Sequence, residues 1–344
     1  MTAVVPPQQS NCHEHASRPF FAADVGGTHV RVGLIQTGDG DRPAIDVLSY
    51  RKYRCADYPG LDAILSDFAS HNPTVADCVI ATAGYALADG SVISANLPWP
   101  LSSRKIREDL GFKSVYLVND FEAVAHAAAH IDDNQVLQLT GPSQTPAGPT
   151  LVIGPGTGLG AALWIPAGTH SMVLPTEAGQ ASLAATTELE MAVLQQMLRT
   201  RPHVSIEHAL SGPGLLNLYN ALCAVRDITP IHITPDAVSA AACDGSDPHA
   251  VEALHLFCGI LGSTIGDMAL LYGVQGGIYL AGGILPKISQ FLLNSTFVER
   301  FLNKGPMRKA LQSIPVKLVE HGQLGVIGAA SWYLEKSAKQ AHAA

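Results

Sequence analysis

Residues 20–36 read FFAADVGGTHVRVGLIQ, two apolar runs separated by a short glycine-rich turn. The first run, Phe20 to Ala23, leads through Asp24 into the turn, and the second run, Val30 to Gln36, follows it. Glycine tolerates the positive φ angles with which a turn can point successive backbone N–H groups at an anion. The stretch therefore predicts two strands joined by a turn that holds a phosphate group.

A second stretch repeats this pattern. Residues 151–165 read LVIGPGTGLGAALWI, again an apolar run, a glycine turn and a second apolar run. Two such hairpins about 130 residues apart indicate a duplicated domain with phosphate held between the two halves. Two unrelated tight turns would give the same local pattern.

Apolar runs and segments of helical period alternate along the chain, which favours an α/β architecture. The predicted strands are Phe20 to Ala23, Val30 to Gln36, Asp46 to Tyr53, Cys78 to Ala83, Val115 to Val118, Thr150 to Ile153, Ala161 to Ile165, Gly277 to Ala281 and Val316 to Leu318. The predicted helices are Leu61 to Ser70, Phe121 to Ile131, Thr187 to Arg199, Gly214 to Val225, Ala250 to Tyr272, Ser289 to Leu293 and Val326 to Lys336. Three glycines within Ala250 to Tyr272 indicate that this helix packs closely against another backbone.

The composition bounds the class of protein. Of the 344 residues 47% are hydrophobic, which is enough for one large domain or two ordinary ones. The chain has 21 Lys and Arg against 29 Asp and Glu, a formal net charge of -8, and no run of five basic residues. Because nucleic-acid binding needs a concentrated positive surface, we expect no nucleic-acid partner.

Cysteine spacing and the chain start indicate the compartment. The six cysteines lie far apart with no C-x-x-C pair, which favours reduced thiols over disulfides or a zinc site. No stretch reaches the roughly 18 uninterrupted apolar residues of a membrane span, and residues 1–18 lack the pattern of a secretion signal. Cys12, His13 and His15 could supply metal ligands, but a flexible terminus gives them no preformed geometry. We expect a cytoplasmic protein away from the membrane, with residues 1–19 as a flexible tail.

Other nucleotide motifs fit less well. No G-x-x-x-x-G-K-[ST] occurs, which excludes a P-loop. Residues Gly156 to Ala161 satisfy G-x-G-x-x-A, but a dinucleotide-binding fingerprint must open a helix. Here a short apolar strand follows and ends at Pro166. A dinucleotide dehydrogenase would depend on this match alone.

Three carboxylates are candidates by position, two of them at the ends of predicted strands, where ligands bind in open α/β sheets, and one shortly after the second hairpin. Asp24 ends the first strand beside the glycine turn, where it could organise magnesium and its waters. Asp120 follows the strand that ends at Val118, and it could either cap the next helix or act in a cleft. Glu177 lies in a segment with no helical or strand pattern, as expected of a loop residue that faces substrate.

Seven motifs follow one another along the chain. They are DVGGT at 24–28, NLPW at 96–99, LVNDF at 117–121, GTGLG at 156–160, EAGQ at 177–180, IEHALSGPG at 206–214 and LAGGI at 280–284. In this order, over about residues 20–335, they resemble the motifs of bacterial glucokinases of the proteobacterial type. The resemblance implies an α/β, two-domain actin-like ATPase (ribonuclease H-like) fold with a central cleft. The implied small domain comprises residues 20–130 and 325–340, and the large domain residues 131–324.

The resemblance implies an ATP-dependent hexose kinase, a glucokinase that phosphorylates the 6-hydroxyl of glucose and forms a homodimer. Asp120 is then the base that accepts the proton of this hydroxyl. The residues implied to hold the sugar are Asn96, Asn119, Asp120, Glu177, Gln180 and Glu207. Those implied to bind ATP are Asp24, Gly26, Gly27, Thr28, Gly156, Thr157, Gly158, Gly282 and Gly283, with Asp24 also steadying Mg²⁺ through water.

One departure opens an alternative. The family pattern has histidine where this chain has Gln180, whose amide has a different reach and never carries charge. This favours weaker glucose binding or a shifted sugar preference, and it is the basis of a second hypothesis, a sugar-binding or regulatory paralogue with weak activity. A DNA-binding repressor would need an added helix-turn-helix, which 18 residues before the first strand cannot form.

Overall fold

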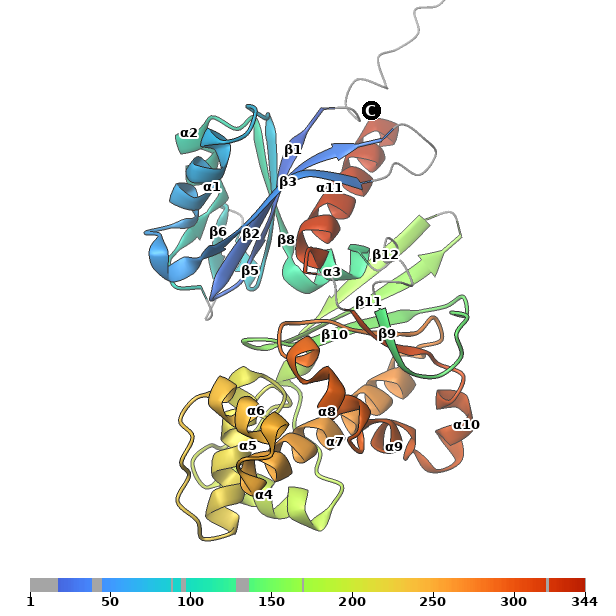
Figure 1. Cartoon of the computed structure of the whole chain (residues 1–344). Helices are drawn as coiled ribbons and strands as arrows, with labels where there is room; N and C mark the ends of the chain where they lie inside the picture. The colour runs from blue at the N-terminus through green and yellow to red at the C-terminus, as the bar shows by residue number, and fades with distance from the viewer. Residues whose placement is uncertain are drawn as a thin grey trace, which may run out of the picture. The chain divides into compact units, whose positions relative to one another are not determined.

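The computed structural model describes residues 18–38, 45–87, 89–93, 97–127, 136–168, 170–319 and 322–343. The chain divides into two compact units (Figure 1). Unit 1 combines the part up to Ala123 with the C-terminal segment from Gln323, and unit 2 is Val124–Gly322. Each unit has its own main sheet, and unit 1 also has a small three-stranded sheet.

The sheet of unit 1 contains the first predicted hairpin. Its strand order is β3-β2-β1-β4-β8, with bounds β1 Phe20–Val25, β2 His29–Thr37, β3 Ile45–Arg54, β4 Asp77–Thr82 and β8 Ser114–Asn119. Strands β1 and β2 pair antiparallel across the turn, with Phe21 opposite Leu34. Strands β1, β4 and β8 run parallel, so their carboxyl ends lie at one edge of the sheet.

Side-chain alternation along β1 explains why helices cover both faces of this sheet. Phe21 packs in one apolar cluster with Phe68 and other residues of α1 (Leu61–Ser70). Phe20 packs in another with Val326 of the C-terminal helix α11 (Leu324–Ala343). Successive strand residues point to opposite faces, so a strand apolar throughout is buried on both sides. The other elements that begin in unit 1 are η1 Cys55–Asp57, β5 Tyr85–Ala86, β6 Ser91–Ile93, β7 Leu101–Ser102, α2 Ser103–Leu110 and α3 Asp120–Ala127. The small three-stranded sheet has the order β5-β6-β7.

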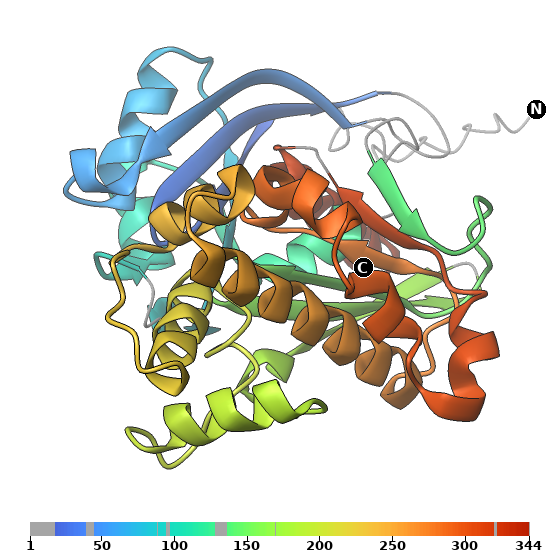
Figure 2. The same ribbon diagram turned by 60° about the horizontal axis from the view of Figure 1, so that its bottom comes forward.

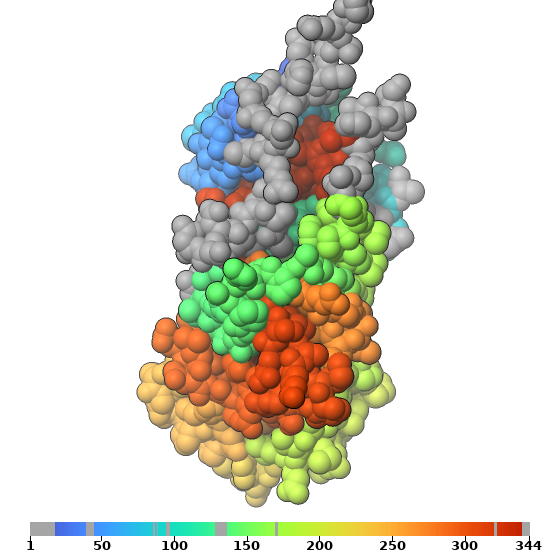
Figure 3. Space-filling view, turned by 90° about the vertical axis from the view of Figure 1, so that its right-hand side faces the viewer, coloured from blue at the N-terminus to red at the C-terminus, as the bar shows by residue number. Residues whose placement is uncertain are grey.

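The sheet of unit 2 contains the second predicted hairpin, β10 (Thr150–Pro155) and β11 (Leu159–Ala167), paired antiparallel. The strand order is β12-β11-β10-β13-β14-β9. The remaining strands are β9 Val136–Thr140, β12 His170–Thr176, β13 Ile278–Leu280 and β14 Val316–Val319. On the face shown in Figure 3, the chain after β9 lies beside the chain before β14, and a Cβ on Gly141 would overlap the backbone of Ile314.

Helices of unit 2 bury the apolar side of this sheet. They are η4 Ala178–Gln180, α4 Glu188–Leu198, α5 Gly212–Val225, α6 Pro235–Asp244, α7 Pro248–Leu271, η5 Leu285–Ile288, α8 Ser289–Leu293, α9 Phe297–Leu302, η6 Gly305–Met307 and α10 Arg308–Leu311. The longest, α7, runs across the sheet (Figure 2). Its length and mean hydropathy of 1.5 would suit a membrane span, but 78% of that window is buried in the protein. Helix α7 is therefore the central core helix of unit 2.

The predicted helices and strands are all present, and most boundaries differ by a few residues. The C-terminal helix α11 was predicted to end at Lys336 but runs on to Ala343. The segment before Glu177 also differs from the prediction. It forms strand β12 rather than an irregular loop. Its alternation is hard to see in the sequence because Met172 and Leu174 are exposed and Pro175 interrupts the pattern. The predicted helix Phe121 to Ile131 appears as α3, and its last residues lie outside the described part of the chain.

Candidate active site

The glycine turn of unit 1 connects β1 and β2 and is fixed on both sides. Gly26 N–H donates to the His29 carbonyl at 3.1 Å, while Cys55 N–H donates to the Thr28 carbonyl at 3.0 Å. Gly27 is half-buried and Thr28 exposed, so this part of the turn faces outward. The prediction that these glycines adopt positive φ is wrong, because neither Gly26 nor Gly27 is in the left-handed region.

Asp24 lies in β1 beside this turn and is paired with a cation. Its Oδ2 lies 3.0 Å from Nη1 of Arg31, directly opposite in β2, and its side chain is 19% exposed. Burial raises the pKa of the Asp24 carboxyl, against the opposing effect of Arg31. A Cβ on Gly325 in α11 would overlap this carboxyl group, so the helix packs directly on Asp24.

Asn119 and Asp120 lie where β8 ends and α3 begins. Asn119 Oδ1 accepts from the N–H groups of Phe121 and Glu122, both at 3.0 Å, and so caps the helix. Asp120 Oδ1 accepts from Phe121 N–H at 2.9 Å. Capping is therefore shared by both residues. Asp24 and Asn119 occupy the same carboxyl edge of the parallel strands, with β4 between them.

Asn96, another predicted sugar-binding residue, lies outside the described residues.

The glycine turn of unit 2 is closed by its own backbone. Gly156 N–H donates to the Gly158 carbonyl at 2.8 Å, and the Gly156 carbonyl accepts from Gly212 at the start of α5, also at 2.8 Å. Neither Gly156 nor Gly158 has a positive φ in the left-handed region, so that prediction is wrong here too. Nothing lies within 4 Å of the Cβ position at Gly156, and Thr157 is exposed. A side chain at 156 would therefore meet no protein atom, so packing within the protein does not require glycine at this position.

A hydrogen-bonded cluster joins this turn to the predicted sugar residues of unit 2. Glu207 Oε2 accepts from Leu159 N–H at 2.8 Å, and Leu159 directly follows Gly158. Glu207 Oε1 accepts from Gln180 Nε2 at 3.2 Å. The Glu177 carbonyl accepts from Gln180 N–H at 2.9 Å. The structure therefore brings Glu177, Gln180 and Glu207 together beside the glycine turn.

His203 is a member of this cluster that the sequence analysis missed. Its Nε2 lies 3.1 Å from the backbone carbonyl of Gln180. Backbone hydrogen bonds also join the segment around residue 180 to that around residue 206. The Glu207 N–H donates to the Gly179 carbonyl at 2.9 Å, and the Ile206 N–H donates to the Ala181 carbonyl at 2.8 Å. No short motif or period in the sequence links residue 203 to residue 180, so nothing local could have indicated this contact.

Gly282 and Gly283 follow β13 and approach the same turn. Gly282 has a φ of +95°, and a Cβ there would overlap the carbonyl of Pro155. A Cβ on Gly154 would overlap the carbonyl of Ala281, whereas the Cβ position of Gly283 is open. Glycine at 154 and 282 therefore lets the two backbones lie in contact next to the turn.

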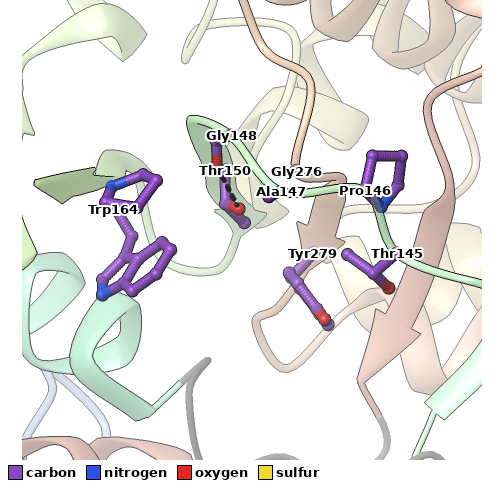
Figure 4. A pocket seen from close by; sticks show the side chains of 9 residues that line it. Thr145, Pro146, Ala147, Gly148, Thr150, Trp164, Gly276 and Tyr279 are labelled. Carbon is purple, nitrogen blue, oxygen red and sulfur yellow. Dashed lines mark hydrogen bonds between the residues drawn. The ribbon is translucent and has the colours of Figure 1, made fainter. Parts of the chain in front are cut away.

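A separate pocket of about 290 Å³ in unit 2 contains none of the predicted site residues. Figure 4 shows Trp164 on one side and Tyr279, Thr145 and Pro146 on the other. The pocket includes Thr150, which is the first residue of β10. The glycine turn follows Pro155, the last residue of β10, so the two ends of this strand are about 17 Å apart. This pocket is not part of the candidate active site.

The described residues contain no group of three or more His, Cys, Asp or Glu that could hold a metal ion. A magnesium ion commonly keeps several waters and takes one or two carboxylates plus substrate phosphates. Asp24, one oxygen of which is paired with Arg31, suits a contact through water better than a closed protein cage. The donor set therefore fits magnesium delivered with a nucleotide.

Comparisons with known proteins agree over nearly the whole chain. The sequence pattern of a family described as Glucokinase matches residues 21–336. A glucokinase-like protein of Xylella fastidiosa is 57% identical over 93% of this chain and 96% of its own. A glucokinase of Saccharophagus degradans is 35% identical over 91% of this chain and 98% of its own. The crystal structure of a glucokinase from an Antarctic psychrotroph has a TM-score of 0.79 and 36% identity, covering 92% of this chain and 98% of that one. The predicted actin-like α/β fold is confirmed.

Proposed function

We propose that this chain, which belongs to the glucokinase family and is a hexose kinase, transfers the γ-phosphoryl group of ATP to the 6-hydroxyl of glucose. The position of Glu207 carries the proposal. One carboxylate oxygen accepts from Leu159 N–H at the glycine turn, and the other from the Gln180 amide. A carboxylate suited to sugar hydroxyls is thus hydrogen-bonded directly to the glycine turn that we assign to phosphate.

Asp120 is the proposed general base. The oxygen of the 6-hydroxyl forms a bond to the γ-phosphorus as the bond to the leaving ADP oxygen breaks, and the hydroxyl proton moves to the Asp120 carboxylate. The transition state is loose, so the protein mainly positions the two oxygens and stabilises charge. The Asp120 backbone is fixed at the junction of β8 and α3, which supports this role.

Hydroxyl recognition is assigned to Asn96, Asn119, Glu177, Gln180 and Glu207. Carboxylates and amides that accept from sugar hydroxyls discriminate strongly, because an analogue lacking a hydroxyl leaves a desolvated polar group unpaired. The cluster of Glu207, Gln180 and His203 supports this assignment, since its side chains are oriented before sugar binds.

The nucleotide is assigned to the two turns and to Gly282 and Gly283. The turn residues are Gly26, Gly27, Thr28, Gly156, Thr157 and Gly158. When bound, magnesium supplies charge neutralisation at the phosphate oxygens, and Asp24 would hold it through water. Backbone amides and one metal ion need no cationic patch, so the net charge of -8 does not oppose this function. A homodimer and a cytoplasmic location belong to the same proposal.

A second candidate is a sugar-binding paralogue with weak activity or shifted hexose preference. The contact of Gln180 with Glu207 favours it, because the amide engages an oxygen that a sugar hydroxyl would otherwise use. Glucose binding without turnover would be its signature.

The test is ADP release from Mg-ATP with glucose, mannose, fructose, N-acetylglucosamine or no sugar. We expect glucose-dependent release that falls by about 10²- to 10⁴-fold in Asp120→Asn, because a positioned base contributes about that factor. Asp109→Asn is the matched control, an exposed carboxylate on α2. Full activity of Asp120→Asn would refute the assignment of the base, and no release with any sugar would refute the kinase.

A further inference from the structure

A second pocket, in unit 1, takes no part in the proposed reaction. It has a volume of about 290 Å³ and is lined by Asp89, Gly90, Ser103, Arg104, Arg107, Lys113 and residues 114–116. It lies between the turn at Gly90, helix α2 and the first half of β8. The lining residue of β8 that lies nearest to the proposed base is Tyr116, about 10 Å along the strand from Asn119 at its end.

This pocket is positively charged in an acidic protein. Arg104, Arg107 and Lys113 line it together with one carboxylate, Asp89. The neighbouring Glu108 lies 3.9 Å from Arg107, and both side chains are at least half exposed, so this pair neutralises little. Three cations around one hollow create a local positive potential that attracts anions. Arginine in particular favours phosphate, because its planar fork donates two parallel hydrogen bonds.

The pocket is also held open by hydrogen bonds. The Gly90 carbonyl accepts from both the N–H group and the Oγ of Ser103, at 2.8 and 3.1 Å, which fastens the turn to the start of α2. Asp89 Oδ1 accepts from Ser91 N–H at 2.9 Å and from Ser91 Oγ at 2.6 Å. The turn that carries Asp89 is therefore in place before a ligand binds, which reduces the entropy cost of binding on this side of the pocket.

Asp89 narrows the chemistry of the ligand. The hydrogen bonds from Ser91 lower the pKa of this carboxyl group, so it is ionised at neutral pH. An ionised carboxylate repels a bare phosphate but accepts hydrogen bonds from hydroxyl groups. A ligand that contacts both the cations and Asp89 therefore needs two kinds of group. A phosphate would bind the cations, and hydroxyl groups would donate to the Asp89 carboxylate.

We propose that this pocket binds a small sugar phosphate, with the phosphate on Arg104, Arg107 and Lys113 and a sugar hydroxyl on Asp89. Its volume lies at the small end of the roughly 300–1,000 Å³ typical of ligand pockets, which fits one phosphorylated monosaccharide better than a macromolecule. The proposal is independent of the reaction proposed above, because it concerns binding at a different place.

The test is a ³¹P NMR titration with ribose 5-phosphate, without ATP or hexose. We expect saturable binding to the wild-type protein and at least about tenfold weaker binding to the double variant Arg104→Gln/Arg107→Gln, since each loses a charge-assisted hydrogen bond. Lys105→Gln is the matched control, because Lys105 lies on the same helix but outside the pocket lining and faces Asp62 at 3.5 Å. Equal affinity of the double variant and the wild type would overturn the proposal.

A second variant tests the hydroxyl contact. Asp89→Asn keeps an oxygen for Ser91 but removes the negative charge, so we expect tighter binding of inorganic phosphate and a smaller preference for ribose 5-phosphate over it. An unchanged preference would overturn the sugar part of the assignment. Displacement of ribose 5-phosphate by a glutamate-rich peptide at equal concentration would overturn it in favour of an acidic protein partner. Hexose phosphorylation by all three variants should stay at the wild-type level, which shows that they fold.

Discussion

Gln180 shows how a single residue can set the character of a binding site. Its side-chain amide donates to Glu207, its backbone carbonyl contacts His203, and its N–H is bonded to Glu177. A histidine here, as in the family pattern, could make a similar contact with Glu207 but would titrate near neutral pH. Glutamine makes the contact without any change of charge.

Gln180→His should therefore make sugar binding depend on pH. An unperturbed histidine has a pKa of about 6.5, and its charged form beside Glu207 would compete with the sugar for this carboxylate. In the wild type, residue 180 does not titrate, so we expect it to cause no change in the KM for glucose between about pH 6 and 8. In the variant, we expect this KM to rise below about pH 6.5.

Gln180→Ala separates the two effects, because it removes the hydrogen bond and adds no titrating group. It should change KM by the same factor at every pH. Identical KM profiles for the wild type and Gln180→His would show that residue 180 does not influence the sugar.

The carboxylate of Asp247 contributes to the stability of the folded protein in a pH-dependent way. It is buried, accepts from Tyr219 Oη and His249 N–H at 2.9 Å each, and lies 3.3 Å from His232 Nε2. Burial alone would raise the pKa of this carboxyl, but the hydrogen bonds outweigh it and the pKa is lowered. Its stabilising effect is therefore complete above the ordinary carboxyl pKa of about 4 and is lost as the pH falls through the lower value of the folded protein.

We expect Asp247→Asn to be roughly 1 kcal/mol less stable than the wild type at pH 7 and to lose less stability on acidification, because the amide keeps an acceptor but not the charge. Urea unfolding from pH 7 to pH 3 measures both quantities. Asp236→Asn is the control, since that side chain is 86% exposed. A parallel loss of stability in all three proteins would contradict the role of Asp247.

At the scale of elements, α7 shows that glycine spacing can report close packing. Cβ atoms on Gly262 and Gly266 would overlap the backbone of α9 at Phe297 and Phe301. The prediction that this helix packs against another backbone is therefore confirmed. Gly259 differs, because its nearest neighbours are side-chain atoms of Thr296 and Arg300.

Gly262→Ala should cost about 1–3 kcal/mol of stability, since overpacking outweighs the gain of up to about 1 kcal/mol in helix propensity. Gly259→Ala should be nearly neutral, because side chains can yield where backbone cannot. Thermal or urea unfolding of the two variants compares them within one helix. Equal stabilities would show that α7 and α9 can move apart without cost.

Helices α2, α6, α9 and α10 are not among the predicted ones, and α2 and α6 illustrate two different reasons. Helix α2 reads SRKIREDL and buries only Ile106, so it lacks an apolar stripe. Helix α6 does carry a start signal, because Thr234 caps it and Pro235 is its first residue. Its alanine-rich interior gives only a weak apolar period, so the start signal is not followed by an amphipathic pattern.

At the scale of the whole molecule, the cores of both units account for the state of the cysteines. The five described cysteines are free, and Cys12 lies outside the described residues. Burial raises the pKa of the Cys258 thiol to about 12 and raises that of Cys78 as well. Only Cys243 among the five is exposed.

We therefore expect one fast thiol in a native Cys12→Ser variant titrated with a thiol reagent at pH 8, and five after denaturation, because buried thiols neither ionise nor meet the reagent. Cys243→Ser in the same background should abolish the fast reaction. Two or more fast thiols in the native protein would mean that one of the cores opens readily.

The sequence by itself determined the local elements and the candidate residues on them. These are the two hairpins, the strand ends at Asp24 and Asn119, and the helices with an apolar period. Each depends on a pattern within about ten residues, which can be recognised without knowing how the chain packs. Most of the helices and strands could be predicted in this way, and the roles of the residues at the strand ends stay predictions.

Only the tertiary structure decided which distant residues meet. The contact of Gln180 with Glu207, the crossing of Gly154 with Ala281, and the gathering of Asp89, Arg104 and Lys113 around one pocket join segments that no local period relates. The expectation of positive φ angles at the glycine turns was wrong because distant contacts, which the local sequence does not show, set the conformation of each turn. Hydrogen bonds from Cys55 and Gly212, far along the chain, hold the conformation of each turn, and those contacts exist only once each unit has packed.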